Sequence, residues 1–268
     1  MIPKVIHYCW FGGKRKPKLI RDCIKSWELQ LPDYEIIEWN EKNSDLTAPF
    51  TKEVYKLKKW AFVADYVRLK VLFDYGGIYL DTDMMVIKSF DVLLLHECFF
   101  GAEDKEHISA GIIGANKGSL FIKQCLLKYD FVSIHQEMNF FHIAMPKIIS
   151  AVFRESRDFF LAFDNIIEKD GVVVYPFNYF YSLSDENKDD VKNYKKYLSP
   201  ESFAVHLWCG SWTDYNEFHY FRNGYYRKGL TKMFQSLYID KPYNYRYFRK
   251  ILSSIKESLT KKVTKIND

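Results

Sequence analysis

Two carboxylates one residue apart, Asp81 and Asp83, directly follow the apolar run at residues 76–80. A glycine pair followed by a short β-rich run predicts a buried strand that ends at a polar site. Carboxylates held this close repel each other unless a cation or hydrogen-bond donors lie between them. Hard divalent cations such as Mg²⁺ and Mn²⁺ prefer oxygen ligands and leave positions for substrate phosphates. The pattern therefore favours a metal–diphosphate site over its alternative, two surface acids in a turn.

A second charged pair, Asp65 and Arg68, lies upstream in a segment predicted to be helical over residues 54–75. Residues three apart share one face of a helix, so these two side chains can contact one ligand or each other. The alternative is an exposed ion pair, which contributes little to stability. Gly76 and Gly77 are expected to end this helix.

The elements that must position these residues alternate between strand and helix patterns along the chain. Such alternation predicts an α/β fold, and its strand–helix–strand start is typical of a nucleotide-binding half. Residues 171–181 are β-rich, and the charged stretch 184–197 favours a surface loop or a frayed helix. The predicted strands cover residues 5–11, 34–39, 78–80, 84–87, 99–101, 110–115 and 203–212. The predicted helices cover residues 19–27, 54–75, 119–129 and 138–153.

The central block, AFVADYVRL at 61–69 and LFDYGGIYLDTD at 72–83, closely resembles the sugar-binding region of family 32 glycosyltransferases. That family includes many bacterial capsule and O-antigen enzymes. The resemblance extends to three further segments, IPKVIHYCWFGG at 2–13, LPDYEIIEWN at 31–40 and HLWCGSW at 206–212. It implies an α/β GT-A fold, with a Rossmann-like nucleotide-sugar-binding domain, a central mixed sheet and the acid pair after a central strand.

The resemblance also implies roles for the four central residues. Asp83 would bind Mn²⁺ or Mg²⁺ directly, and Asp81 would contact the nucleotide ribose or the water shell of the metal. Asp65 and Arg68 would hold hydroxyls of the transferred sugar. Carboxylate acceptors and a guanidinium donor suit vicinal hydroxyls chemically.

Four further residues receive donor-binding roles from the same resemblance. Trp10 would flank the base, while His206, Ser211 and Trp212 would close over the diphosphate. For His206 two interpretations stay open, a ligand to the metal or a hydrogen-bond donor inside the core. Candidate walls for the acceptor are Glu103, Asp104, His107, Asn116 and the stretch 175–181.

The resemblance implies a metal-dependent, retaining transferase that moves a hexose from a nucleotide-sugar, and we favour UDP over GDP-mannose as the nucleotide. The acceptor would be an oligosaccharide or a lipid-linked glycan in bacterial surface-polysaccharide synthesis. Because no second acid stands out as a nucleophile, we favour a front-face substitution. One alternative is a non-catalytic sugar-binding or scaffold protein with the same fold. Another is a haloacid-dehalogenase-like phosphatase, which gives no role to Asp65 and Arg68.

Composition sets the remaining expectations. A hydrophobic content of 48% is ample for a core. The five cysteines form no CxxC pair, which argues against zinc and favours free thiols in a reducing cytosol. The N-terminus lacks the pattern of a signal peptide. The cysteines are Cys9, Cys23, Cys98, Cys125 and Cys209.

The net charge of +5 is concentrated at the C-terminus. Residues 241–268 carry a surplus of basic side chains, while residues 1–240 are close to neutral, which argues against nucleic-acid binding. We therefore expect a catalytic domain over 1–240 and a basic amphipathic helix over 241–268. Such a helix predicts peripheral association of a cytoplasmic protein with the inner face of the cytoplasmic membrane. The alternatives are docking on the protein body or pairing with a second copy.

Overall fold

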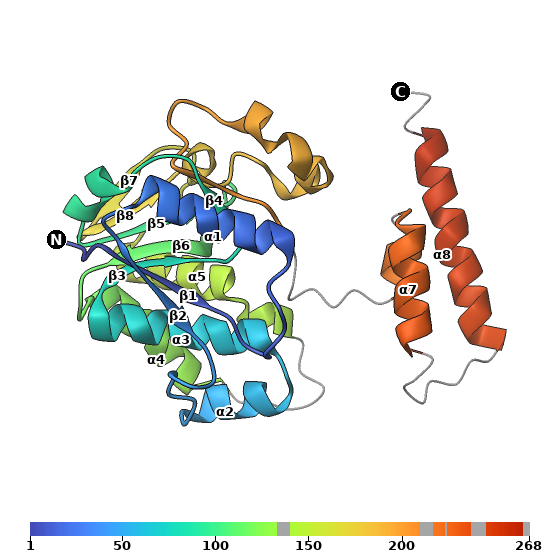
Figure 1. Ribbon diagram of the computed structural model, residues 1–268, viewed down its shortest axis with the longest axis horizontal. Coiled ribbons are helices and arrows are strands. Elements are labelled where there is room, and N and C mark those ends of the chain that lie inside the picture. Colours follow the sequence, from blue (N-terminus) through green and yellow to red (C-terminus); the bar gives the residue numbers. More distant parts are fainter. Residues whose placement is uncertain (133–139, 210–216, 223, 237–244, 265–268) are drawn as a thin grey trace. The chain divides into compact units, whose positions relative to one another are not determined.

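The computed structural model describes residues 1–132, 140–209, 217–222, 224–236 and 245–264 (Figure 1). Contacts divide the chain into two compact units, Met1–Cys209 and Gly210–Asp268. This division falls earlier than the predicted boundary between residues 240 and 241. The reason is that helices α6 and α7, which precede that boundary, pack with each other and with the C-terminal helix α8.

The described part of the first unit contains a seven-stranded mixed sheet in the order β2-β1-β3-β6-β5-β8-β7. Strand β1 pairs in parallel with β2 and β3, and β5 pairs in parallel with β8. The β3–β6, β6–β5 and β8–β7 pairs are antiparallel. The mixed α/β architecture predicted for the chain is thus confirmed. The strands are β1 (Val5–Cys9), β2 (Glu35–Trp39), β3 (Gly77–Leu80), β5 (Cys98–Ala102), β6 (Ile108–Ala115), β7 (Ile167–Lys169) and β8 (Val172–Tyr175).

Both faces of this sheet are buried, so its central strands are nearly continuous apolar runs. In β3, Ile78 and Leu80 face one hydrophobic cluster while Tyr79 faces the other, as the alternation of a strand requires. Helix α1 covers the first face, and α2 to α5 cover the second (Figure 1). Their bounds are α1 (Lys18–Gln30), α2 (Pro49–Lys56), α3 (Trp60–Tyr75), α4 (Leu120–Asp130) and α5 (Met145–Arg157).

The single helix predicted over residues 54–75 is wrong, because α2 and α3 are separate. Between them Lys58 takes a left-handed conformation with a φ of 56°, which a continuous helix does not allow. Helix α3 is buried on most sides, including at Asp65 and Arg68. Its end matches the expectation, since Gly76 has a positive φ of 70° and follows the last helical residue.

Two other predicted elements are shorter in the structure. The helix predicted over 138–153 begins only at Met145, with Pro146 in its first turn, where a proline is tolerated. A 3-10 turn, η2 (Phe140–Ile143), precedes it. The β-rich stretch 171–181 contains β8, then Pro176 and the 3-10 turn η3 (Phe177–Tyr179). The remaining 3-10 segments are η1 (Asp91–Leu95) and η4 (Asp185–Tyr197).

A small antiparallel sheet joins β4 (Met84–Val86) to β9 (Ala204–His206). The strand predicted over 203–212 therefore stops at His206. The chain turns after it because Trp208 adopts a φ of 49°, and its indole N–H donates to the Leu183 carbonyl at 2.6 Å. Residues 210–216 lie outside the described residues.

The second unit contains α6 (Glu217–Arg222), α7 (Tyr226–Ser236) and α8 (Tyr245–Thr264). Ion pairing and hydrogen bonding hold these helices together, including a 2.6 Å contact between the hydroxyls of Tyr226 and Ser258. Across the residues that the structure describes, no helix has the length and hydrophobicity to cross a membrane.

Candidate active site

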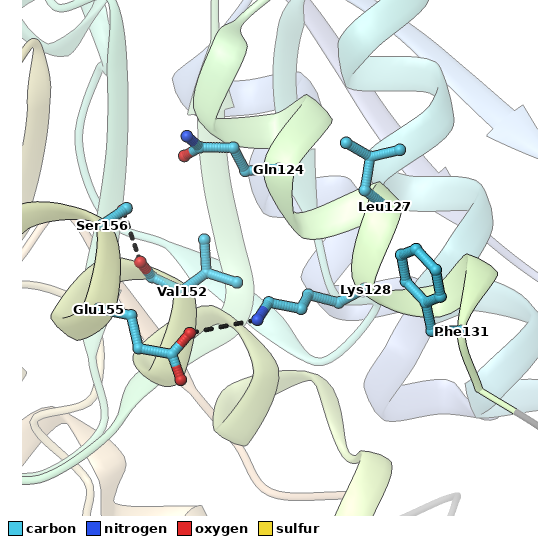
Figure 2. Close-up of a pocket in the computed structure, with 7 residues that line it drawn as sticks. All are labelled: Gln124, Leu127, Lys128, Phe131, Val152, Glu155 and Ser156. Atoms are coloured by element: carbon cyan, nitrogen blue, oxygen red, sulfur yellow. Dashed lines mark hydrogen bonds and ion pairs between the residues drawn. The ribbon is translucent and has the colours of Figure 1, made fainter.

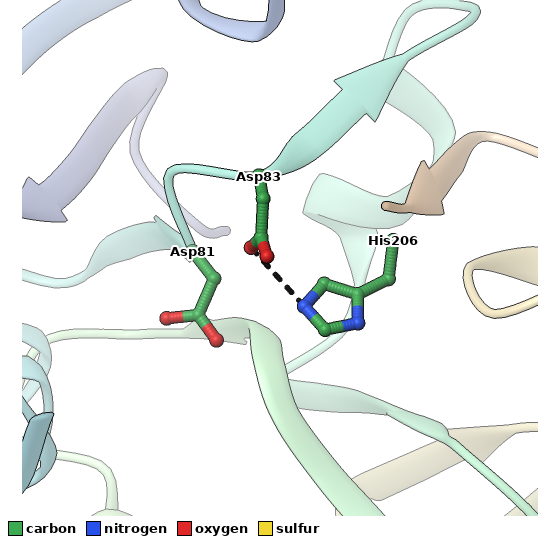
Figure 3. A group of neighbouring side chains, drawn as sticks. All are labelled: Asp81, Asp83 and His206. Carbon is green, nitrogen blue, oxygen red and sulfur yellow. Dashed lines mark ion pairs between the residues drawn. The ribbon is translucent and has the colours of Figure 1, made fainter. Parts of the chain in front are cut away.

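The acid pair lies where β3 ends and the chain turns into β4. The backbone N–H of Asp81 donates to the Gly111 carbonyl on the neighbouring strand at 2.8 Å. The Met84 N–H then donates back to the Asp81 carbonyl at 3.0 Å, which closes a tight turn around Asp83. Because Met84 pairs with His206 in the small sheet, this turn places the Asp83 carboxylate beside the imidazole. Figure 3 shows the side chain of His206 directed at Asp83.

The carboxylate of Asp83 is buried, and both of its oxygens have partners. One oxygen lies 3.1 Å from Nε2 of His206. The other accepts the backbone N–H of Cys209 at 2.8 Å. Burial alone would raise the pKa of Asp83, but the charge and hydrogen bond of His206, with the Cys209 N–H, lower it below the ordinary value. Asp83 is thus held in its anionic form.

His206 contacts Asp83 from the end of strand β9. Its burial would lower the pKa of the imidazole, but the Asp83 carboxylate outweighs burial and raises the pKa above the ordinary value. Nδ1 of His206 is buried without a hydrogen-bond partner among the described residues. The ring lies 4.3 Å from the Trp208 ring in an edge-on contact, which fixes its orientation.

The three side chains fit a divalent cation. Asp81, Asp83 and His206 each offer one ligand atom, and these atoms lie within 4.8 Å of one another. Neighbouring ligands of an octahedral cation, each about 2.1 Å from it, lie about 3 Å apart. The 3.1 Å separation between Asp83 and His206 matches that spacing. Two carboxylates suit Mg²⁺ or Mn²⁺.

Arg68 links the acid pair to Asp65 from helix α3. Its guanidinium lies 3.0 Å from the Asp65 carboxylate and 3.3 Å from that of Asp81. It also donates to the Ala110 carbonyl at 2.6 Å and stacks over the Tyr79 ring at 4.4 Å. Arg68 is only 5% exposed. The alternative of an exposed ion pair is therefore wrong, because this pair is part of a buried network.

Asp65 is the most strongly perturbed acid of this network. Burial raises its pKa to about 7, although Arg68 and the backbone N–H of Met145 act in the opposite direction. The pKa of Arg68 itself is raised: burial opposes its charge, but Asp81, Tyr79 and Asp65 outweigh that effect. The guanidinium is thus a fixed cation between the carboxylates of Asp65 and Asp81.

The structure brings together five of the eight predicted central and donor-binding residues. They are Asp65, Arg68, Asp81, Asp83 and His206. Trp10 follows β1 and is half-buried, with its indole N–H donating to the Lys14 carbonyl at 2.6 Å. Ser211 and Trp212 lie outside the described residues.

The predicted acceptor walls separate into two groups. Glu103 is close enough to His206 for each to influence the other's pKa, and burial raises the pKa of Glu103. Asp104 and His107 lie beside Glu103, and one side-chain ligand atom from each of the three residues lies within 4.8 Å of the other two. Asn116 is wrongly assigned, because it follows the residue of β6 that pairs with Gly77 at the start of β3. It therefore lies at the opposite end of that strand from the acid pair.

Sequence reasoning missed Tyr79 as a contributor to the site and included Tyr181 only within the candidate acceptor wall at residues 175–181. The hydroxyl of Tyr79 donates to Asp81 at 3.1 Å, and the buried ring of Tyr181 lies 5.6 Å from that of His206. A tyrosine in a fully buried strand is a detectable signal, since its hydroxyl needs a partner. A separate hollow of about 450 Å³ between α4 and α5 is lined by other residues, shown in Figure 2, and includes none of this network.

Comparison with known proteins agrees with this geometry. Residues 17–100 match the family described as glycosyltransferase sugar-binding region containing DXD motif. This stretch of the chain is therefore similar to a glycosyltransferase sugar-binding region. That region includes Asp65, Arg68 and both acids of the DXD motif at residues 81–83, so the resemblance to family 32 glycosyltransferases is confirmed.

Curated relatives share this part of the chain. The sequence is 29% identical over 135 residues to inositol phosphoceramide mannosyltransferase 3 of Schizosaccharomyces pombe, covering 46% of this chain and 36% of that protein. It is 27% identical over 158 residues to lactosylceramide 4-alpha-galactosyltransferase of Mus musculus, covering 54% of this chain and 40% of that protein. The chain thus matches well under half the length of these relatives.

Solved glycosyltransferases resemble the fold more distantly. A PaToxG glycosyltransferase shares 19% identity with a TM-score of 0.47, covering 58% of this chain and 70% of that one. The galactosyltransferase LgtC, in complex with donor and acceptor sugar analogs, shares 15% identity with a TM-score of 0.41. That match covers 77% of this chain and 87% of LgtC.

Proposed function

We propose that this protein is a metal-dependent glycosyltransferase that moves a hexose from a nucleotide-sugar to a glycan acceptor. The observation that carries the proposal is that Arg68 pairs with both Asp65 and Asp81, and that a carboxylate oxygen of Asp81 lies within 4.8 Å of the ligand atoms of the Asp83–His206 pair. This arrangement sets a buried sugar-binding pair beside a set of cation ligands. A phosphatase of the haloacid-dehalogenase type has no use for the buried Arg68.

The chain's own residues have distinct tasks in this proposal. Asp83 and His206, with Asp81, would hold Mn²⁺ or Mg²⁺, whose charge stabilises the departing diphosphate. Asp65 would accept a hydroxyl of the transferred sugar. Arg68, fixed by Asp81 and the Ala110 carbonyl, would orient that carboxylate and donate to a neighbouring hydroxyl.

The donor is proposed to be a UDP-hexose rather than GDP-mannose, and the acceptor a lipid-linked glycan or oligosaccharide of bacterial surface-polysaccharide synthesis. The names of the two relatives support a hexose, since one is a mannosyltransferase and the other a galactosyltransferase. Both names also specify a ceramide-based acceptor, which supports a lipid-linked one here.

Transfer is proposed to retain the anomeric configuration through a front-face substitution. The described carboxylates beside the cation ligands support this: Asp65 is paired with Arg68, and burial favours the protonated form of Glu103. Neither is suited to serve as a nucleophile. A glycosyl group trapped on a protein carboxylate and detected by mass spectrometry would refute the front-face step.

The decisive experiment is a panel of UDP- and GDP-sugars tested with Mn²⁺ for thermal stabilisation and then for turnover. A ligand that binds only the folded state raises its stability with concentration. The proposal expects one UDP-hexose to stabilise the protein in the presence of Mn²⁺ and to be consumed. Binding without turnover, even with glycan acceptors supplied, would indicate the non-catalytic sugar-binding alternative.

A further inference from the structure

Helix α8 is packed in an unusual way within the second unit. The residues that it buries include Ser254, 1% exposed, and Ser258, 4% exposed. Ser258 contacts the Tyr226 hydroxyl at 2.6 Å, and Tyr247 donates to Glu217 at 3.0 Å. Among the described residues, α8 thus packs in this unit through polar contacts, through the ring pair of Tyr247 and Phe218 at 5.2 Å, and through the buried Ile251.

The large apolar side chains of the same helix are instead exposed. Leu252 is 67% exposed and Leu259 is 53% exposed, while Phe248 is half exposed. Positions 248, 252 and 259 recur at helical spacing, so they form one stripe along α8. We call these three residues the α8 stripe. Because α8 buries serines and exposes leucines, its apolar face does not serve to pack the helix within its own unit.

Basic side chains border the α8 stripe. Arg249 and Lys256 are exposed beside it on the same helix, whereas Lys250 lies 4.5 Å from the centre of the Phe218 ring in α6. The sequence is also basic beyond residue 260, with Lys261, Lys262 and Lys265. An apolar stripe bordered by basic residues matches an anionic lipid surface, where acyl chains receive the apolar residues and headgroups pair with the cations. A second copy of the helix would bring like charges together, which opposes dimer formation through this face.

We propose that the α8 stripe is a docking surface for an anionic lipid bilayer, on which helix α8 lies parallel to the membrane plane. This inference goes beyond the proposed function, because it assigns a partner to the second unit and needs no catalytic residue. Its consequence for the protein is retention at the surface where lipid-linked acceptors are found. Its test is independent of catalysis, so it can fail while the transferase proposal stands.

The test is flotation of the full chain with vesicles of phosphatidylglycerol and phosphatidylcholine, compared with phosphatidylcholine alone. The expected result is flotation with the anionic vesicles, weakened by salt because exposed charges are screened. The variant Leu252→Ser/Leu259→Ser removes apolar surface at unchanged charge. Its partition coefficient should fall about tenfold for each leucine, the effect of losing most of one buried side chain.

The matched control is Leu95→Ser/Leu120→Ser, which makes the same exchange at two leucines of the first unit that are at least as exposed. It should float like the unchanged protein. Circular dichroism should give equal helix content for all variants, since neither pair packs in a core. The proposal is overturned if the unchanged chain stays unbound with anionic vesicles, or if the α8 variant floats equally well. A dimer by light scattering that the α8 variant loses, without flotation, would assign the stripe to a second copy instead.

Discussion

The carboxylate of Asp83 lies 3.1 Å from Nε2 of His206, and the pairing of β4 with β9 creates this contact. Within the described part of the chain, neither side chain forms an ion pair with a residue nearby in sequence. The contact lowers the pKa of Asp83 and raises that of His206. It joins the DXD motif to a late segment of the chain, so both segments contribute side chains to the proposed cation site.

The first prediction concerns this cation site. Asp83→Asn keeps the shape of the side chain but removes its charge. Mn²⁺-dependent turnover should fall at least about a hundredfold, because loss of a residue that only supports a metal ligand already lowers activity about 10- to 100-fold. The metal concentration needed for half-maximal stabilisation should rise in parallel. Asp164→Asn, at an exposed acid of the same unit, is the control and should leave both quantities unchanged. Unaltered metal dependence in Asp83→Asn would refute the role of Asp83.

The second prediction concerns the stability of the buried network. Arg68→Met leaves the Asp65 and Asp81 carboxylates without their cation, and should reduce the free energy of unfolding by about 3–5 kcal/mol. Lys70→Met on the same helix is the matched control, because Lys70 pairs with Asp74 at a partly exposed site. That pair should contribute at most about 1 kcal/mol. Urea unfolding measures both, and equal effects of the two substitutions would contradict the network.

The third prediction is a pH dependence that follows from Asp65. Its pKa is about 7 in the folded protein, compared with an ordinary value of 3.8, so the folded state binds this proton more tightly than the unfolded chain. The contribution of this group to stability is therefore complete below the ordinary value and is lost as the pH rises towards 7. Asp65→Asn should remove this loss, as measured by urea unfolding without ligands between pH 5 and pH 8.

The control for this pH dependence is Asp91→Asn. The hydrogen bond from Lys4 lowers the pKa of Asp91, so its own titration falls below the tested range. That variant should keep the pH dependence of the unchanged protein. If the slopes of Asp65→Asn and the unchanged protein were the same, the raised pKa of Asp65 would be disproved.

The fourth prediction tests how closely Gly111 and Tyr181 approach at the site. A Cβ at position 111 would lie 2.8 Å from the Tyr181 hydroxyl and 3.4 Å from a carboxylate oxygen of Asp81. Gly111→Ala should therefore displace Tyr181, whose ring contacts His206, and lower turnover about ten- to a hundredfold, as small misplacements at an active site do. Adding Tyr181→Phe removes the hydroxyl and should restore much of the activity. If the double variant were no better than Gly111→Ala, contact with this hydroxyl would not be the cause.

The sequence by itself determined the local parts of this site. Alternation placed Ile78 and Leu80 on one side of a buried strand and ended that strand at Asp81. Helical spacing placed Asp65 and Arg68 on a common face, where the structure finds them in contact. These features depend on sterics and periodicity over a few residues, so a single sequence contains them.

Only the tertiary structure decided how these parts meet. In it, Arg68 is buried between two acids and His206 contacts Asp83. Asn116 follows the end of β6 that is distant from the acid pair. The tertiary structure also divided the long helical pattern at Lys58. Which strands pair and which segments meet depends on contacts between residues distant in sequence, and the local pattern does not specify those partners. The sequence therefore predicted candidate residues for the chemistry, and the long-range packing decided which of them lie together.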